Sequence, residues 1–133
     1  MEEKKKMNDI PNKVINSFDI DGVIYMGDAF TGVFPGPDDV IITGRSRDDE
    51  GEITTKMLTN RGIYNKVYMN PLKFDEKTRK SSGQHKGRTL FHLEQMGYRF
   101  GAHFEDDPIQ AAEIRKIMPG INIVMLEHNL TEK

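Results

Sequence analysis

The sequence predicts an α/β fold: a single Rossmann-like domain with a parallel β-sheet and helices on both faces. Short apolar runs alternate along the chain with segments of helical periodicity, the pattern of parallel strands joined by crossover helices. The chain has 133 residues, a length that suits one domain with its own core. We assign residues 13–133 to this domain and expect the charged residues 1–12 to form a flexible N-terminal leader.

Five strands are expected from runs rich in β-branched and other apolar residues, each bounded by turn signals. The runs cover residues 14–19, 40–43, 66–70, 102–105 and 121–126. The fourth run is short and gives the weakest signal of the five.

Three helices are expected between these strands. The first runs from the capping-box-like residues 49–52 to Gly62, with apolar residues at helical spacing. The second follows Lys86 in the same way and is closed by Gly97. The third has Pro108 in its first turn, where proline is well tolerated.

Composition and charge exclude several classes of protein. The chain has no cysteine, so it has no disulfide, zinc–thiolate site or cysteine nucleophile. Its formal net charge of -2 does not draw the whole surface to nucleic acid or to a membrane. No apolar run approaches the ~20 residues of a membrane span, and the first residues lack the apolar core of a signal peptide. We therefore expect a cytoplasmic protein without a membrane partner.

Polar and charged residues gather where the predicted strands end, the edge at which open parallel sheets bind ligands. They are Asp19 and Asp21 after the first strand, Thr43, Gly44 and Arg45 after the second, Asp106 and Asp107 after the fourth, and Lys86 at the start of the preceding helix. We expect the fold to bring these groups into one crevice.

This set of groups suits phosphoryl transfer. Carboxylates bind Mg²⁺, which is then shared with a substrate phosphate, and an Asp carboxylate can attack phosphorus to form an aspartyl-phosphate. A second carboxylate two residues along can protonate the leaving oxygen and later activate water. The hydroxyl of Thr43, the amide of Gly44 and the ammonium of Lys86 can hold the phosphoryl oxygens.

Four motifs resemble those of the haloacid dehalogenase (HAD) superfamily, in the family's order, between about residues 14 and 126. Phe18-Asp19-Ile20-Asp21-Gly22-Val23 resembles the first motif, Thr43 the second, Lys86 the third, and Asp106-Asp107 the fourth. The resemblance implies a five-stranded sheet of order 5-4-1-2-3.

The resemblance also implies a role for each matching residue. Asp19 would be the nucleophile and a metal ligand, and Asp21 would be the general acid/base with its backbone carbonyl on the metal. Thr43 and Lys86 would bind phosphate. Asp106 would hold Mg²⁺, with Asp107 joining it or orienting Lys86. Lys80 competes with Lys86 for the third motif.

The segment after the first motif departs from the family, most of whose members place a helix there. Residues 25–39 contain Gly27, Gly32, Pro35, Gly36 and Pro37, so we expect a turn and a loop or small hairpin instead. No room remains for a cap domain, either there or between Thr43 and Lys86. The resemblance then implies a large substrate, or a lid supplied by a partner subunit.

The expected function is that of a capless, Mg²⁺-dependent phosphomonoesterase that forms an aspartyl-phosphate. Nucleotides and nucleic-acid 3′-phosphate ends are the expected substrates, because similar members often carry the sequence seen at Thr43-Gly44-Arg45. Arg45 is a candidate substrate contact. A basic segment also favours a phosphate-rich substrate, although a solvated loop explains it as well: Lys73, Lys77, Arg79, Lys80, His85, Lys86 and Arg88.

Other readings remain open at this stage. A non-catalytic protein of the same fold could bind a phosphorylated partner or Mg²⁺ alone. A phosphotransfer receiver domain groups carboxylates with Thr and Lys, but its phosphorylated Asp ends the third strand. Asp19 and Asp21 also fall on spacing like that of a calcium loop, without its flanking helices. Asp107 could simply be the N-cap residue before Pro108.

Overall fold

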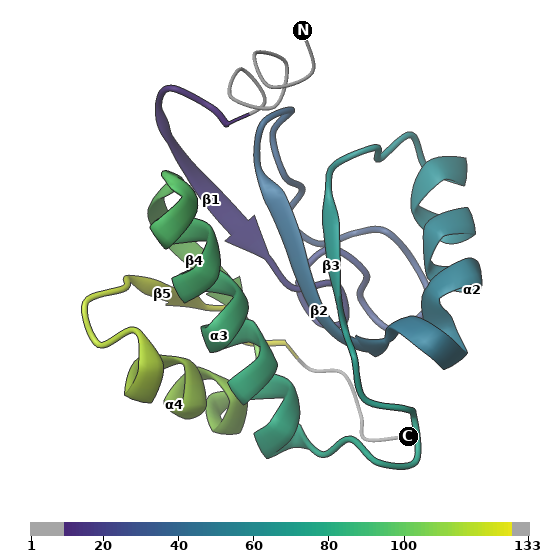
Figure 1. Cartoon of the computed structure of the whole chain (residues 1–133). Coiled ribbons are helices and arrows are strands. Elements are labelled where there is room, and N and C mark those ends of the chain that lie inside the picture. The colour runs from purple at the N-terminus through teal and green to yellow at the C-terminus, as the bar shows by residue number, and fades with distance from the viewer. Residues whose placement is uncertain (1–9, 129–133) are drawn as a thin grey trace, which may run out of the picture.

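The computed structural model describes residues 10–128 and contains the predicted strands and helices (Figure 1). The predicted leader therefore lies almost wholly outside the described residues. In chain order the elements are β1 (Val14–Phe18), β2 (Val40–Ser46), α2 (Arg47–Asn60), β3 (Val67–Asn70), α3 (Arg79–Met96), β4 (Arg99–Glu105), α4 (Pro108–Ile117) and β5 (Ile123–Met125).

The five strands form one all-parallel sheet with β1 at its centre. The order is β3-β2-β1-β4-β5, which is the predicted 5-4-1-2-3 counted from the other edge. Phe18, the last residue of β1, pairs with Ile41 of β2 and with Phe104 of β4. The carboxyl ends of the three inner strands therefore meet at the same edge of the sheet.

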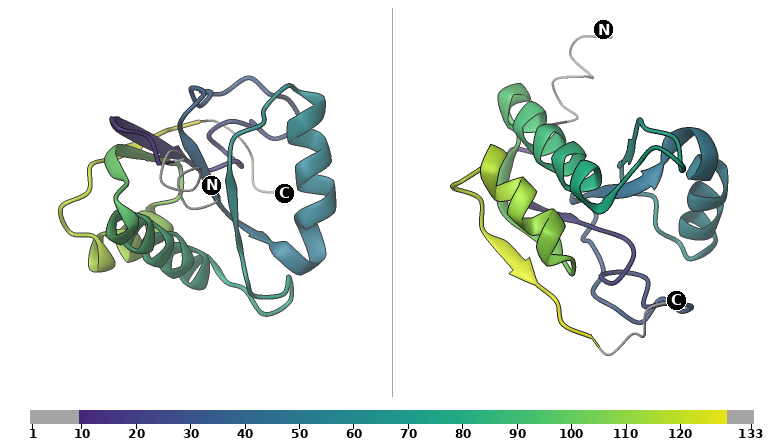
Figure 2. Two further views of the ribbon diagram at one scale, coloured as in Figure 1. Left: turned by 45° about the horizontal axis from the view of Figure 1, so that its top comes forward. Right: turned by 90° about the horizontal axis from the view of Figure 1, so that it is seen from below.

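Both faces of the sheet are covered by helices, as predicted. Successive side chains of a strand point to opposite faces, and the strands carry apolar residues on both. Ile15 and Ile42 face a core cluster that includes Leu90 of α3 and Ile114 of α4. Phe18 and Ile41 belong to the core cluster on the other side, which includes Leu58 of α2. Figure 2 shows α3 and α4 side by side, with α2 well away from both.

The connection from β1 to β2 has no helix, as its glycines and prolines predict. Its backbone folds back on itself: the N–H of Gly32 donates to the carbonyl of Ile24 (3.2 Å), and that of Val33 donates to the carbonyl of Val23 (2.8 Å). Val23 and Ile24 are fully buried in the core that also holds α2. The segment is thus a small hairpin-like turn packed on the sheet, and residues 10–128 contain no cap domain.

Helix α3 begins seven residues before the predicted start at Lys86. Thr78 is its N-cap residue and forms a capping box with Ser81, in which each side chain accepts a hydrogen bond from the other residue's backbone N–H. Lys86 consequently lies in the second turn of the helix with its side chain toward the sheet. Among the described residues, none of the helices combines the length and apolar character needed to cross a membrane.

Two glycines let α3 and α4 approach closely. A Cβ atom at Gly83 would lie 2.8 Å from both the Cα and the carbonyl oxygen of Gln110, and one at Gly87 would lie 2.9 Å from Cδ1 of Ile117. Side chains at either position would therefore push the two helices apart. The close contact brings the N-terminus of α4 beside that of α3.

We expect Gly83→Ala to lower the free energy of unfolding by about 1–3 kcal/mol, because the new methyl group meets the backbone of α4. The matched control is Gly51→Ala in α2, where the nearest atom is Sδ of Met69 at 3.8 Å. This substitution should raise stability by about 0.5–1 kcal/mol through helix propensity. Urea unfolding followed by circular dichroism measures both, and a shift of the same sign in both variants would contradict the packing argument.

Candidate functional site

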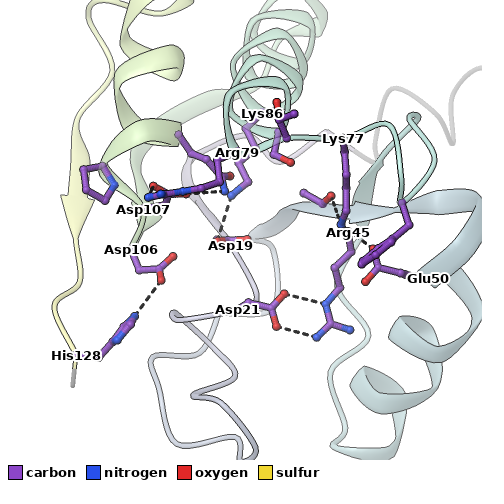
Figure 3. A pocket seen from close by; sticks show the side chains of 16 residues that line it. Asp19, Asp21, Arg45, Glu50, Lys77, Arg79, Lys86, Asp106, Asp107 and His128 are labelled. Atoms are coloured by element: carbon purple, nitrogen blue, oxygen red, sulfur yellow. Dashed lines mark hydrogen bonds and ion pairs between the residues drawn. The ribbon is translucent and has the colours of Figure 1, made fainter. Parts of the chain in front are cut away.

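A pocket of about 810 Å³ opens at the carboxyl ends of β1, β2 and β4 (Figure 3). Most of the predicted site residues line it: Asp19, Asp21, Gly44, Arg45, Lys86, Asp106 and Asp107. Thr43 is buried and does not line the pocket, although its neighbour Gly44 does. Lys80 is exposed on the first turn of α3, so Lys86 is the lysine that the fold brings to the pocket.

Asp19 and Lys86 form a buried ion pair at the floor of the pocket. The Nζ atom of Lys86 lies 3.1 Å from Oδ2 of Asp19, and the side chains are 1% and 7% exposed. The other carboxylate oxygen of Asp19 accepts a hydrogen bond from the backbone N–H of Ile20 (2.8 Å). Asp19 is therefore held in one orientation at the end of β1.

The second carboxylate partner of Lys86 is Glu105, which the sequence did not single out. Nζ of Lys86 donates to Oε1 of Glu105 at 2.9 Å, and Glu105 is fully buried. The role predicted for Asp107, that of orienting Lys86, thus belongs to Glu105, two residues earlier. The signal that could have found it is strand alternation: Glu105 ends β4 on the face toward α3, whereas Asp107 lies beyond the strand.

Asp107 caps α4 and pairs with an arginine. Its carboxylate accepts from the backbone N–H of Ile109 (2.9 Å) and from Nε2 of Gln110 (3.0 Å). Arg79 donates to both oxygens at 2.9 and 2.6 Å. These donors occupy both oxygens, so the N-cap interpretation accounts for Asp107, and its side chain lies outside the acidic cluster described next.

Three carboxylates lie close enough to share a metal ion: Asp19, Glu105 and Asp106, with potential ligand oxygens all within 4.8 Å of one another. All are hard oxygen donors of the kind that suits Mg²⁺. Asp106 is held at the pocket by Nε2 of His128, 2.9 Å from its Oδ2 (Figure 3). The donor set therefore fits a divalent cation, with Glu105 in the place predicted for the side chain of Asp107.

The electrostatics of the cluster show an excess of negative charge. Burial raises the pKa of Asp19 well above its usual range, and the ammonium of Lys86 offsets this only in part. Burial also opposes ionisation of Glu105, but Lys86 and then His103 outweigh it and lower the pKa of Glu105 to about 2. Burial disfavours the charge of Lys86, yet the carboxylates of Asp19 and Glu105 raise its pKa. One ammonium is thus shared between two carboxylates, and a divalent cation would let Asp19 ionise.

Gly22, the residue after Asp21, makes room for Asp106. Its φ of 83° lies in the left-handed region, and a Cβ atom there would lie 2.0 Å from Oδ2 of Asp106. Glycine is therefore required here for two independent reasons, backbone conformation and space. The contact links the loop after β1 to the carboxylate after β4.

Arg45 holds the predicted general acid/base. Its Nε and Nη2 atoms donate to the two carboxylate oxygens of Asp21 at 2.9 and 2.7 Å. Its Nη1 atom donates to Oγ1 of Thr54 (3.2 Å) and contacts Sδ of Met57 (3.3 Å). The guanidinium is mostly buried, whereas Asp21 is exposed to the pocket. Arg45 is therefore the partner of Asp21, and since it also lines the pocket, its contact with a substrate stays a prediction.

Thr43 and Gly44 are the fourth and fifth residues of β2, which extends three residues beyond the predicted end of this strand. Oγ1 of Thr43 accepts from the backbone N–H of Arg45 (3.1 Å), and the carbonyl of Gly44 accepts from Nζ of Lys77 (3.0 Å). A Cβ atom at Gly44 would lie 2.8 Å from Oγ of Ser82, so a side chain is excluded there. Gly44 thus presents backbone, and no side chain, to the pocket.

Comparison of the chain with protein-family models, with curated proteins and with solved structures found no match. The function is therefore inferred from the geometry of the pocket.

Proposed function

We propose that the protein is a Mg²⁺-dependent phosphomonoesterase of the HAD type, with Asp19 as its nucleophile. The observation that carries the proposal is the position of Asp19, a buried carboxylate that faces an ammonium and belongs to a cluster of carboxylates spaced to share a metal ion. A carboxylate of this kind at the carboxyl edge of a parallel sheet suits attack on a phosphate bound in the pocket.

Each step of the reaction has a group in the pocket. The carboxylate of Asp19 attacks phosphorus, the bond to the leaving alcohol breaks, and Asp21 donates a proton to that oxygen. Asp21 then takes a proton from water, which attacks the aspartyl-phosphate and releases inorganic phosphate and free Asp19. Mg²⁺ held by Asp19 and Asp106 would neutralise the charge that otherwise repels the phosphate.

The pocket offers ammonium and N–H groups to an anionic substrate, and the proposed Mg²⁺ would offset the carboxylates that also line it. Lys86 lies at the floor and Lys77 on the wall. The first turns of α3 and α4 also open on the pocket, through Thr78 and through Asp107 with Pro108. Helix N-termini attract anions, because their backbone N–H groups carry partial positive charge.

An exposed phenylalanine on the rim supports a substrate with a planar ring, such as a nucleotide. Phe74 lines the pocket and is 61% exposed. Its backbone N–H donates to Oδ2 of Asp49 (2.8 Å), and Nζ of Lys77 lies 5.2 Å from its ring centroid. The ring is therefore held at the rim, with surface left for stacking.

Replacing Phe74 with Ala should raise KM for nucleoside monophosphates by about 5- to 100-fold, the loss expected for one base–aromatic stack. Hydrolysis of glycerol phosphate should not change, because that substrate has no ring. The control is Tyr64→Ala, which removes another exposed ring that lies outside this pocket. Steady-state kinetics give KM for both substrates. An equal rise in KM for nucleoside monophosphates and for glycerol phosphate would contradict a stacking role.

The direct test of the proposed function is release of inorganic phosphate from p-nitrophenyl phosphate, nucleotides and a 3′-phosphorylated oligonucleotide. We expect turnover with Mg²⁺ and none with EDTA. The second candidate is a non-catalytic protein that binds Mg²⁺ or a phosphorylated partner, and the salt bridge that occupies both oxygens of Asp21 favours it. Mg²⁺ binding by calorimetry without turnover of any of these substrates would select that candidate.

A further inference from the structure

A chain of buried polar side chains lies behind the pocket and has no part in the reaction proposed above. It starts at Ser17 on β1, passes through His103 on β4 and ends at Glu105, and all three residues are 0% exposed. Ser17 and His103 are paired neighbours in the sheet. Burying polar groups is unfavourable unless they are hydrogen-bonded, so this chain needs an explanation.

The hydrogen bonds in this chain have a single direction. A carboxylate can only accept, so Nε2 of His103 donates to Oε1 of Glu105, at 3.0 Å. Nδ1 of the same ring lies 2.7 Å from Oγ of Ser17. In the ring protonated on Nε2 alone, Nδ1 accepts a hydrogen bond from this hydroxyl.

Glu105 is thereby held on both of its oxygens. Oε1 accepts hydrogen bonds from Nε2 of His103 and Nζ of Lys86, and Oε2 accepts one from the backbone N–H of Asp107 at 3.3 Å. Lys86 divides its donors between Glu105 and Asp19, at 2.9 and 3.1 Å. Without the N–H of His103, Lys86 would be the one side-chain donor to Oε1 among the described residues, and it would move toward Glu105 and away from Asp19.

We propose that His103, supported by Ser17, is a positioning residue that holds Glu105 in the orientation that directs Lys86 at Asp19. The inference rests on the proposed function, because the position of Lys86 matters for catalysis only if Asp19 is the nucleophile. Outer-shell hydrogen bonds of this kind fix the geometry of groups that contact a metal or substrate.

Three variants test the proposal on the full chain. His103→Leu removes both hydrogen bonds, His103→Gln keeps an N–H donor near the position of Nε2, and Ser17→Ala removes the support alone. We expect His103→Leu to lower kcat by about 10- to 100-fold, and His103→Gln to recover most of that loss. The control Ile114→Val perturbs the core on the same face of the sheet and leaves the hydrogen bonds of Ser17, His103 and Glu105 intact. It should keep wild-type kcat despite a lower Tm.

A spectroscopic measurement tests the hydrogen-bond direction itself. The ¹⁵N shifts of the His103 ring should show the Nε2-protonated tautomer in the wild type, and Ser17→Ala should shift the Nδ1 resonance. The opposite tautomer would overturn the proposal. So would wild-type kcat in His103→Leu, or losses in His103→Gln as large as those in His103→Leu at equal Tm.

If the wild-type protein hydrolyses no phosphate ester, the proposed function is wrong, but His103 could still position Lys86. Crystal structures of the two His103 variants then test this positioning role. Lys86 should leave its position 3.1 Å from Asp19 in His103→Leu and keep it in His103→Gln. An unmoved Lys86 in His103→Leu overturns the positioning role, whatever the activity.

Discussion

Asp19→Asn should lower kcat for Mg²⁺-dependent phosphate release by about 10⁴-fold or more, as the loss of a catalytic nucleophile does in other enzymes. The amide is a poor nucleophile and cannot form the aspartyl-phosphate. The fold should survive, because the amide oxygen can still accept from the backbone N–H of Ile20. Colorimetric phosphate release measures the effect.

The control for this substitution is Asp28→Asn, which makes the same chemical change on an exposed residue of the same β1–β2 connection. It should leave kcat unchanged. A single-turnover experiment adds a second readout, since wild-type protein quenched in acid should carry covalent phosphate and the Asp19→Asn variant should not. Residual activity of the variant near wild type would reject Asp19 as the nucleophile.

Lys86→Met should lower the free energy of unfolding by about 3–5 kcal/mol, because it leaves buried carboxylates without their cation. Methionine matches the lysine stem in volume, so the effect reports charge and not packing. Phosphate release should be lost as well, since the ammonium faces Asp19 at the floor of the pocket. Urea unfolding and the phosphate assay measure the two losses.

Lys80→Met on the exposed first turn of α3 is the control, and it should stay within about 0.5 kcal/mol of wild type. Adding Glu105→Gln to Lys86→Met removes one of the carboxylates that lost its cation, so the double variant should recover part of the stability. No recovery would mean that Glu105 is not the partner whose charge Lys86 balances.

Hydrophobic patterning predicts the sheet well because both of its faces are buried. Ile41 and Ile42 face opposite cores, so a continuous apolar run is what such a strand requires. Helix α3 begins earlier than the apolar pattern predicts, because residues 79–85 are polar and show no apolar stripe. Its beginning is set instead by the hydrogen bonds between Thr78 and Ser81, where the sequence lacks the usual Glu or Gln.

Sequence motifs predict the site residues that follow a strand, but they do not predict those that lie within a strand. Glu105 and His103 interrupt the apolar pattern of a weak strand, although the alternation of side chains between the two faces of the sheet puts both on the face toward α3. The salt bridge of Arg45 joins residues far apart in the sequence, because its partner Asp21 lies 24 residues earlier. Sequence spacing alone does not distinguish an arginine in such a salt bridge from one that contacts a substrate.

The glycine contact between α3 and α4 bears on how the protein could acquire a new substrate. Gly83 and Gly87 flank Lys86 on α3, and both abut α4, so backbone packing fixes the height of the ammonium in the pocket. Residues 72–77 on the rim are largely exposed. Directed evolution of specificity should therefore draw its accepted substitutions from the rim, while libraries that vary the two glycines yield mostly inactive clones.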